Sequence, residues 1–102
     1  MESGTEDIRQ KLNFETARIP WAELQRHFAR GHVVKVAQGV DLLEVAEALG
    51  LDEVTKVSRW MSHGVIAVAT LDDAREWNRD QASPWAVVVA PWVLVQNPVE
   101  VG

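Results

Sequence analysis

The sequence predicts an α+β fold with a small mixed sheet of about three strands, at about 33–37, 65–69 and 86–95, covered by about four to five helices. Short runs rich in β-branched and apolar residues alternate with longer segments in which apolar residues recur at helical spacing. The chain has 102 residues, 47% of them hydrophobic and 25% charged, which suits one globular domain. We expect a single domain over residues 1–102, with loose ends at about 1–4 and 98–102.

The helices are predicted from their capping signals and from the spacing of their apolar residues. Asp41 is placed to cap the clearest of them, in which four apolar residues recur at i, i+3, i+4 and i+7 before Gly50. Thr70 and Asp73 have the spacing of a capping box. Pro20 suits the first turn of a helix, where its missing N–H loses no hydrogen bond. The expected helices run from Thr5 to about Glu15, from Pro20 to Gly31, from Asp41 to Gly50, from Asp52 to about His63 and from Thr70 to about Asp80.

The strands are predicted from apolar runs, of which Val65–Ala69 is typical of a strand buried on both faces. The segment Ser83–Asn97 contains no ionisable side chain, but Pro91 cannot donate a ladder hydrogen bond. We therefore expect either two strands separated by Pro91 or one strand with a bulge there. In an unbroken strand, Trp85 and Trp92 would face opposite sides, which would turn one of them outward. The expected core is built around four tryptophans, Trp60, Trp77, Trp85 and Trp92.

Composition excludes several kinds of site and compartment. The chain has no cysteine, so it has no disulfide, no thiolate nucleophile and no Cys-ligated metal. Its first residues are polar and acidic, unlike a secretory signal, and its longest apolar run, Trp85–Val95, is shorter than the roughly 20 residues of a membrane helix. We therefore expect a soluble, cytoplasmic protein without membrane contact.

No residue pattern predicts catalysis, a cofactor or a metal site. The histidines His27, His32 and His63 are not paired with another ligand at i, i+4, so we assign them structural roles. No serine lies in a Gly-x-Ser-x-Gly elbow, and no glycine-rich phosphate loop is present. We expect a domain that is not an enzyme and holds no cofactor.

Residues 41–69 support an alternative function. Two helices joined by a short Gly50-Leu51 turn and followed by an apolar strand resemble a helix-turn-helix with the first strand of a wing. Lys56 and Arg59 would then contact DNA. The net charge of −5, with ten acidic and five basic groups in residues 32–102, opposes binding to a phosphate backbone and makes nucleic acid a disfavoured partner.

Two short segments are candidates for interaction or ligand contact. In Arg18-Ile19-Pro20-Trp21, an arginine beside a helix that begins with proline can stack on an indole or hold an acidic group. A pocket near Arg18 and Trp21 would fit a small-molecule-binding protein or an enzyme. The second segment is the end of the apolar run around Trp92, where an outward-facing indole would form a binding face.

Three segments carry a family resemblance: Glu15–Arg26 (Glu-Thr-Ala-Arg-Ile-Pro-Trp-Ala-Glu-Leu-Gln-Arg), Asp41–Ala46 (Asp-Leu-Leu-Glu-Val-Ala) and Trp85–Gln96 (Trp-Ala-Val-Val-Val-Ala-Pro-Trp-Val-Leu-Val-Gln). Over residues 14–96 the chain resembles a family of small bacterial proteins, found in proteobacteria and cyanobacteria, that is described only as a domain of unknown function. The resemblance implies no activity, cofactor or catalytic residue.

The function expected from the sequence is that of a small non-catalytic module that binds a protein partner or associates with itself as a homo-oligomer. This expectation rests on the missing catalytic signatures and on an indole-rich sheet in a small chain. The DNA-binding and small-molecule-binding alternatives remain beside it.

Overall fold

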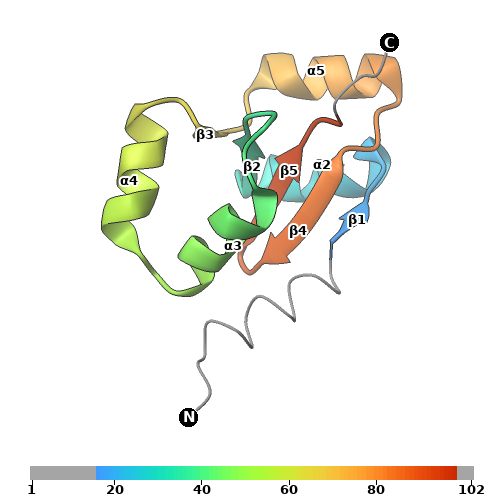
Figure 1. Ribbon diagram of the computed structural model, residues 1–102. Helices are drawn as coiled ribbons and strands as arrows, with labels where there is room; N and C mark the ends of the chain where they lie inside the picture. Colours follow the sequence, from blue (N-terminus) through green and yellow to red (C-terminus); the bar gives the residue numbers. More distant parts are fainter. Residues whose placement is uncertain (1–15, 99–102) are drawn as a thin grey trace.

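A computed structural model describes residues 16–98 of the chain. These residues form an α+β fold with four helices and a five-stranded mixed sheet, so the predicted fold class is confirmed (Figure 1). The helix expected at 5–15 and the loose end expected at 1–4 lie outside the described residues, and so does the loose end expected at 98–102 except for Pro98. The elements are β1 (Ala17–Arg18), α2 (Trp21–Ala29), β2 (Val33–Val36), α3 (Leu42–Gly50), α4 (Val54–Ser62), β3 (Ile66–Val68), α5 (Leu71–Asp80), β4 (Trp85–Val89) and β5 (Trp92–Gln96).

The sheet has the strand order β1-β4-β5-β2-β3. Strand β5 pairs in parallel with β2, and the other neighbouring pairs are antiparallel. The expectation of about three strands was too low for two reasons. Ala90–Pro91 is a cis peptide bond between two strands, β4 and β5, and the short β1 forms only because Ala17 and Arg18 meet β4 in space. Strand β4, with which β1 pairs, is far from β1 in the sequence, so no local pattern predicts β1.

The break at Pro91 also changes the orientation of the two tryptophans that flank it. In the β4–β5 hairpin, Trp85 lies opposite Gln96, and Val89 lies opposite Trp92. Because alternate residues of a strand share a face, Trp85, Val89 and Trp92 all lie on the same side of the sheet. The expectation that Trp85 and Trp92 face opposite sides applied only to an unbroken strand.

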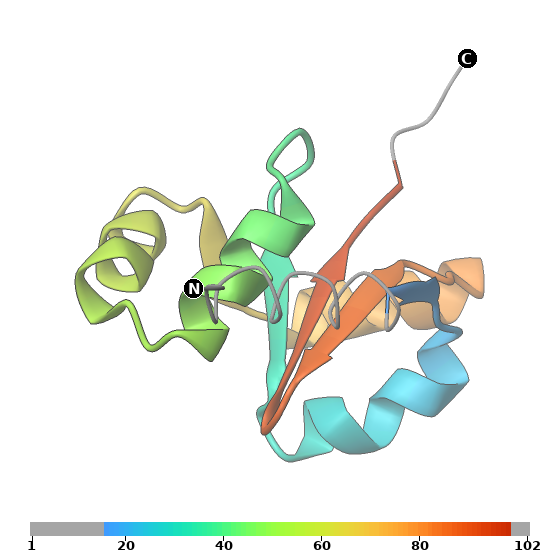
Figure 2. The same cartoon turned by 60° about the horizontal axis from the view of Figure 1, so that its bottom comes forward.

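The core consists of two hydrophobic clusters, one on each face of the sheet, and Figure 2 shows helices on both sides. Helix α3 covers one face, which we call the α3 face, and α4 continues from it. Helices α2 and α5 cover the other face, which we call the α2/α5 face. The buried residues on the α3 face are Val34, Val36, Leu42, Val45, Ala46, Ile66, Val87 and Leu94. Those on the α2/α5 face are Trp21, Leu24, Val33, Ala74, Trp77, Ala86, Val93 and Val95.

The tryptophans contribute to this core differently from the prediction. Trp77 is buried as expected, and Trp60 and Trp92 are partly buried against the α3-face cluster. Trp85 is 40% exposed, whereas Trp21, which was expected at an interaction site, is only 6% exposed. Trp21 packs against Trp77 with ring centroids 5.7 Å apart, so these two indoles form the aromatic centre of the α2/α5 face.

The helix caps confirm the prediction for Asp41 and correct the prediction for Asp52. The side chain of Asp41 accepts hydrogen bonds from the backbone N–H groups of Leu43 and Glu44 and caps α3. Asp52 was expected to cap α4, but it adopts a left-handed conformation with φ of 57°. The N-cap position of α4 belongs to Glu53, which makes no side-chain capping bond. The turn between α3 and α4 is therefore longer than the expected Gly50-Leu51 step.

The capping box at the start of α5 is tied to the sheet by a lysine. Asp73 accepts from the Thr70 backbone N–H at 2.8 Å, and the Thr70 hydroxyl oxygen accepts from the Asp73 backbone N–H at 3.2 Å. The Lys35 ammonium on β2 lies 2.7 Å from the other carboxylate oxygen of Asp73. Partial burial raises the pKa of Asp73, but the hydrogen bonds from Lys35 and Thr70 outweigh it and hold the pKa below its ordinary value.

Replacing Asp73 with alanine should destabilise the domain by about 1–2 kcal/mol, because the variant loses a helix cap and an ion pair. The measurement is urea unfolding of the variant and of an Asp72→Ala control. Asp72 also lies in the first turn of α5, but its side chain is 93% exposed beside Arg75. We expect the control to change stability by less than about 0.5 kcal/mol. Equal losses in the two variants would contradict the role assigned to Asp73.

The depressed pKa of Asp73 also predicts a dependence of stability on pH. A carboxylate whose pKa is lower in the folded state stabilises the protein fully above its unfolded value of about 3.9. That stabilisation is lost as the pH falls through the folded pKa. The destabilising effect of Asp73→Ala should therefore be largest at neutral pH and shrink below about pH 4. Urea unfolding at a series of pH values tests this, and an effect that grows in acid would refute it.

Candidate functional site

Arg18 lies on the short edge strand β1, opposite Trp85 of β4. Its guanidinium Nε donates to the Ser83 carbonyl, and its Cζ lies 5.5 Å from the centre of the Trp85 ring. Arg18 thus stacks on an indole, as its sequence context suggested, but the indole is Trp85 and not the nearby Trp21. The arginine also lines a groove of about 560 Å³ that includes the carboxylates of Glu76 and Asp80.

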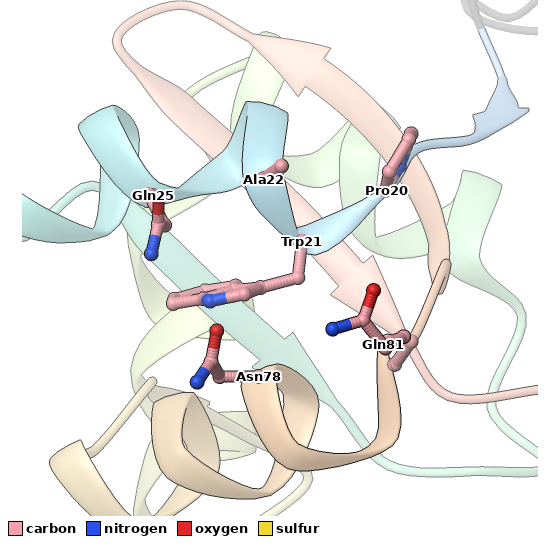
Figure 3. Close-up of a pocket in the computed structure, with 7 residues that line it drawn as sticks. Pro20, Trp21, Ala22, Gln25, Asn78 and Gln81 are labelled. Atoms are coloured by element: carbon pink, nitrogen blue, oxygen red, sulfur yellow. The ribbon is translucent and has the colours of Figure 1, made fainter.

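Trp21 lies at the start of α2 and lines a separate, smaller cavity of about 130 Å³ between α2 and α5. Figure 3 shows three carboxamide side chains around its indole: Gln25 from α2, Asn78 from α5 and Gln81 from the end of α5. The backbone N–H of Trp21 donates to the Ala82 carbonyl at 2.9 Å, which ties the two walls of the cavity together. The cavity is therefore an uncharged depression in which three carboxamides lie beside an indole and other apolar residues.

The indole N–H of Trp21 has no hydrogen-bond partner in the structure, although the nitrogen is buried. The ring itself is held by Phe28 and Trp77, each with its centroid 5.7 Å from that of Trp21. A buried donor without an acceptor costs about 1–3 kcal/mol, so such groups in native proteins usually meet water, a side chain or a ligand. Of the buried side-chain polar atoms in residues 16–98, this nitrogen is the one without a partner.

The sequence predicted one pocket near Arg18 and Trp21, and the structure places these residues in two cavities that share only Ala82 among their lining residues. The carboxamides of Gln25, Asn78 and Gln81 were not expected at any site. They lie on the polar sides of two helices far apart in the sequence, so no spacing rule could have joined them. The only sequence signal was the adjacent pair Pro20-Trp21 at the start of a helix.

Trp92, the third residue proposed for interaction, begins β5 and is half-buried. Its ring meets that of His32 edge to face, with centroids 5.7 Å apart. His32 immediately precedes β2, the parallel neighbour of β5, so this contact joins the starts of two inner strands. Its exposed part remains a candidate for partner contact.

Lys56 and Arg59, the residues of the DNA-binding alternative, lie on α4. The Lys56 ammonium is 3.7 Å from a Glu44 carboxylate oxygen and 3.9 Å from one of Glu53, and it lies 5.4 Å from the centre of the Trp60 ring. The strand after α4 pairs with β2 in the main sheet and leads into α5, so it does not form a wing hairpin. One of the two expected cations is thus already held by acidic neighbours.

Within residues 16–98, no group of three histidine, aspartate or glutamate side chains is arranged to hold a metal ion. The three histidines lie on different elements, with His27 in α2, His32 before β2 and His63 at the end of α4. In the same part of the chain, every helix is too short or too polar to cross a bilayer.

The strand β3 stands at the end of the sheet, opposite to β1 in the strand order. Its run was expected to be buried on both faces, and only Ile66 is buried. Ala67 and Val68 are exposed, and Val68 keeps 45% of its surface accessible. The prediction was wrong here because an apolar run does not tell an inner strand from an edge strand.

A model of the family described as "Protein of unknown function (DUF2288)" matches residues 7–97. The chain belongs to this family. The resemblance found in the sequence is thereby confirmed, and the family description assigns no activity.

Among solved structures, the DUF2288 chain is similar to PA1075 from Pseudomonas aeruginosa, whose structure was determined in solution by NMR. The two are 45% identical, the match covers 98% of this chain and 93% of PA1075, and the TM-score is 0.81. None of the curated proteins matches the chain.

The geometry of α4 predicts that this DUF2288 domain does not bind duplex DNA. Lys56 lies within ion-pair distance of Glu44 and Glu53, and the whole chain carries a charge of −5. We expect no mobility shift with duplex DNA even at low salt, where electrostatic binding is strongest. A salt-sensitive shift that is lost in Lys56→Ala and Arg59→Ala would establish the helix-turn-helix alternative instead.

Proposed function

We propose that this domain is a non-catalytic module that binds protein by adding a strand to the open edge of β3, and that the strand added is the β3 of a second copy of the chain. The observation that carries the proposal is an exposed, uncharged, apolar edge strand. We place the module in the cytoplasm, because a chain without cysteine needs no oxidising compartment.

The hydrogen bonds of β3 determine which of its backbone groups face the open edge. The Ala69 N–H donates to the Val33 carbonyl, and the Ala37 N–H donates to the Val65 carbonyl, both at 2.9 Å. In an antiparallel ladder, residues alternate between those that bond to the neighbouring strand and those that point away from it. Ile66 and Val68 therefore direct their N–H and C=O groups away from β2. In the described chain no strand pairs with them on that side.

This edge lacks most of the features that usually prevent association. Natural edge strands commonly carry a charge, a proline or a bulge, and residues 65–69 carry no charge and no proline. The strand is short, which limits the number of new hydrogen bonds. Exposed apolar residues also lie before and after β3 in the sequence, with Met61 48% and Leu71 58% exposed.

A second copy fits this edge because the antiparallel order can continue across a two-fold axis. With Ala67 on the axis, Ile66 of one copy would pair with Val68 of the other, and the two sheets would join as β2-β3-β3-β2. The exposed Val68 side chains would then be covered by apolar neighbours. Residues 65–69 carry no charge, so the net charge of −5 per chain is not concentrated at the contact. Such an interface is small, so we expect a dissociation constant in the micromolar range or weaker.

The test is the replacement of Val68 by lysine, which places a charge on the open edge, against a matched Val88→Lys control. Val88 is 43% exposed on β4, which β5 and β2 separate from β3. Analytical ultracentrifugation should show dimers of the wild-type chain and of Val88→Lys, and monomers of Val68→Lys. Both variants should unfold within about 1 kcal/mol of the wild type, because both sites are exposed.

Wild-type protein that stays monomeric up to about 1 mM would overturn self-association. Dimers that persist in Val68→Lys would place the interface elsewhere and refute the β3 edge. Amide hydrogen exchange gives an independent readout, since the Ile66 and Val68 amides should become more protected as the protein concentration rises.

A further inference from the structure

We propose that the cavity beside Trp21 is a binding site for a small neutral molecule that carries an amide group. The cavity lies between α2 and α5, whereas the proposed protein-binding edge is β3, so neither proposal depends on the other. The inference rests on the unpaired indole N–H, on the uncharged polar lining and on the size of the cavity.

The first argument is the unsatisfied donor. Trp21 is 94% buried, and its Nε1 has no acceptor in the structure. The ring cannot easily turn to find one, because Phe28 and Trp77 pack against it and its backbone N–H is bonded to Ala82. An acceptor must therefore come to the indole, and a carbonyl oxygen is the acceptor of matching strength.

The second argument is the chemistry of the lining. Every residue around the cavity is uncharged, and three of them, Gln25, Asn78 and Gln81, carry carboxamides. A charged ligand would give up its hydration without gaining an opposite charge, which disfavours it. A carboxamide offers both donors and an acceptor, so it can match the N–H and the C=O of a ligand amide at the same time.

The third argument is room and access. A volume of about 130 Å³ is far above the 10–15 Å³ or so that a single water requires, so the cavity can take a group of several heavy atoms. The carboxamide residues are exposed, and Figure 3 shows their side chains gathered around the indole. The indole nitrogen is itself shielded from solvent, so a ligand reaches it only when a neighbouring side chain moves aside. Rotation of an exposed helix side chain is fast and needs no backbone movement.

The experiment is a titration of the ¹⁵N-labelled full-length chain with acetamide and with N-methylacetamide, followed through the tryptophan indole signals. The chain has five tryptophans, and the Trp21→Phe variant identifies the Trp21 signal. We expect that signal to shift and to saturate with a dissociation constant in the millimolar range, as befits so small a probe. The signals of Trp85 and Trp92 should not follow it. Acetate, which has the same shape but carries a charge, should produce no saturable shift.

Variants locate the binding site. Gln25→Ala and Asn78→Ala should weaken acetamide binding several-fold, whereas the matched control Gln38→Ala removes a carboxamide outside the cavity and should leave binding unchanged. Thermal unfolding of each variant shows that it is folded.

Three results would overturn the proposal. Shifts that grow linearly without saturation, or equal shifts with acetate, would mean that the probe does not bind there specifically. A wild-type Trp21 signal that responds to no probe but is displaced by Asn78→Ala would show that Asn78 itself accepts from the indole.

Discussion

The strand β5 must be apolar on both of its faces, and both hydrophobic clusters depend on this constraint. Leu94 belongs to the α3 face, whereas Val93 and Val95 belong to the α2/α5 face, and all three are almost fully buried. β5 lies between an antiparallel and a parallel neighbour, so its backbone groups are also paired on both sides. A polar residue at any of these three positions would remove part of the apolar surface of β5 on which one layer of helices packs.

Polar contacts then anchor the end of β5. Gln96 donates through its amide to the carbonyls of Ala37 and Val40 at 2.9 and 2.7 Å, in the turn that leads into α3. One residue further, Asn97 accepts from the Trp77 indole at 2.8 Å, which ties the strand to α5. The central strand is thereby connected to the helices of both layers.

The two proposed sites differ in what the fold leaves unsatisfied. At β3 the unsatisfied groups are the backbone N–H and C=O groups of Ile66 and Val68, which point away from the sheet. At Trp21 the unsatisfied group is one buried indole nitrogen in a carboxamide-lined cavity. The proposed partner of the first is an extended protein segment, and the proposed ligand of the second is a small amide. Neither requires a charged group or a metal ion.

The sequence by itself determined the local elements. The capping residues Asp41 and Thr70, the apolar spacing of α3 and the proline between β4 and β5 are signals read within a few residues, and the structure contains the elements that they predict. The α+β class followed from the same local patterns, whereas the family was identified by the resemblance of three segments, Glu15–Arg26, Asp41–Ala46 and Trp85–Gln96. Where a local signal was ambiguous, as at Asp52, the prediction was wrong, because a side chain that can cap a helix can equally tolerate a left-handed turn.

Only the tertiary structure decided the order of the strands and the contents of the sites. Whether Val65–Ala69 is an inner or an edge strand depends on what lies beside it, and an apolar run looks the same in both cases. Burial of Trp21 and exposure of Trp85 depend on which helix reaches each face, which composition does not encode. The cavity joins Gln25 to Asn78 and Gln81 across more than half of the chain. Contacts between residues this far apart arise when two layers of helices pack on one sheet, and the hydrophobic periodicity of the sequence does not predict them.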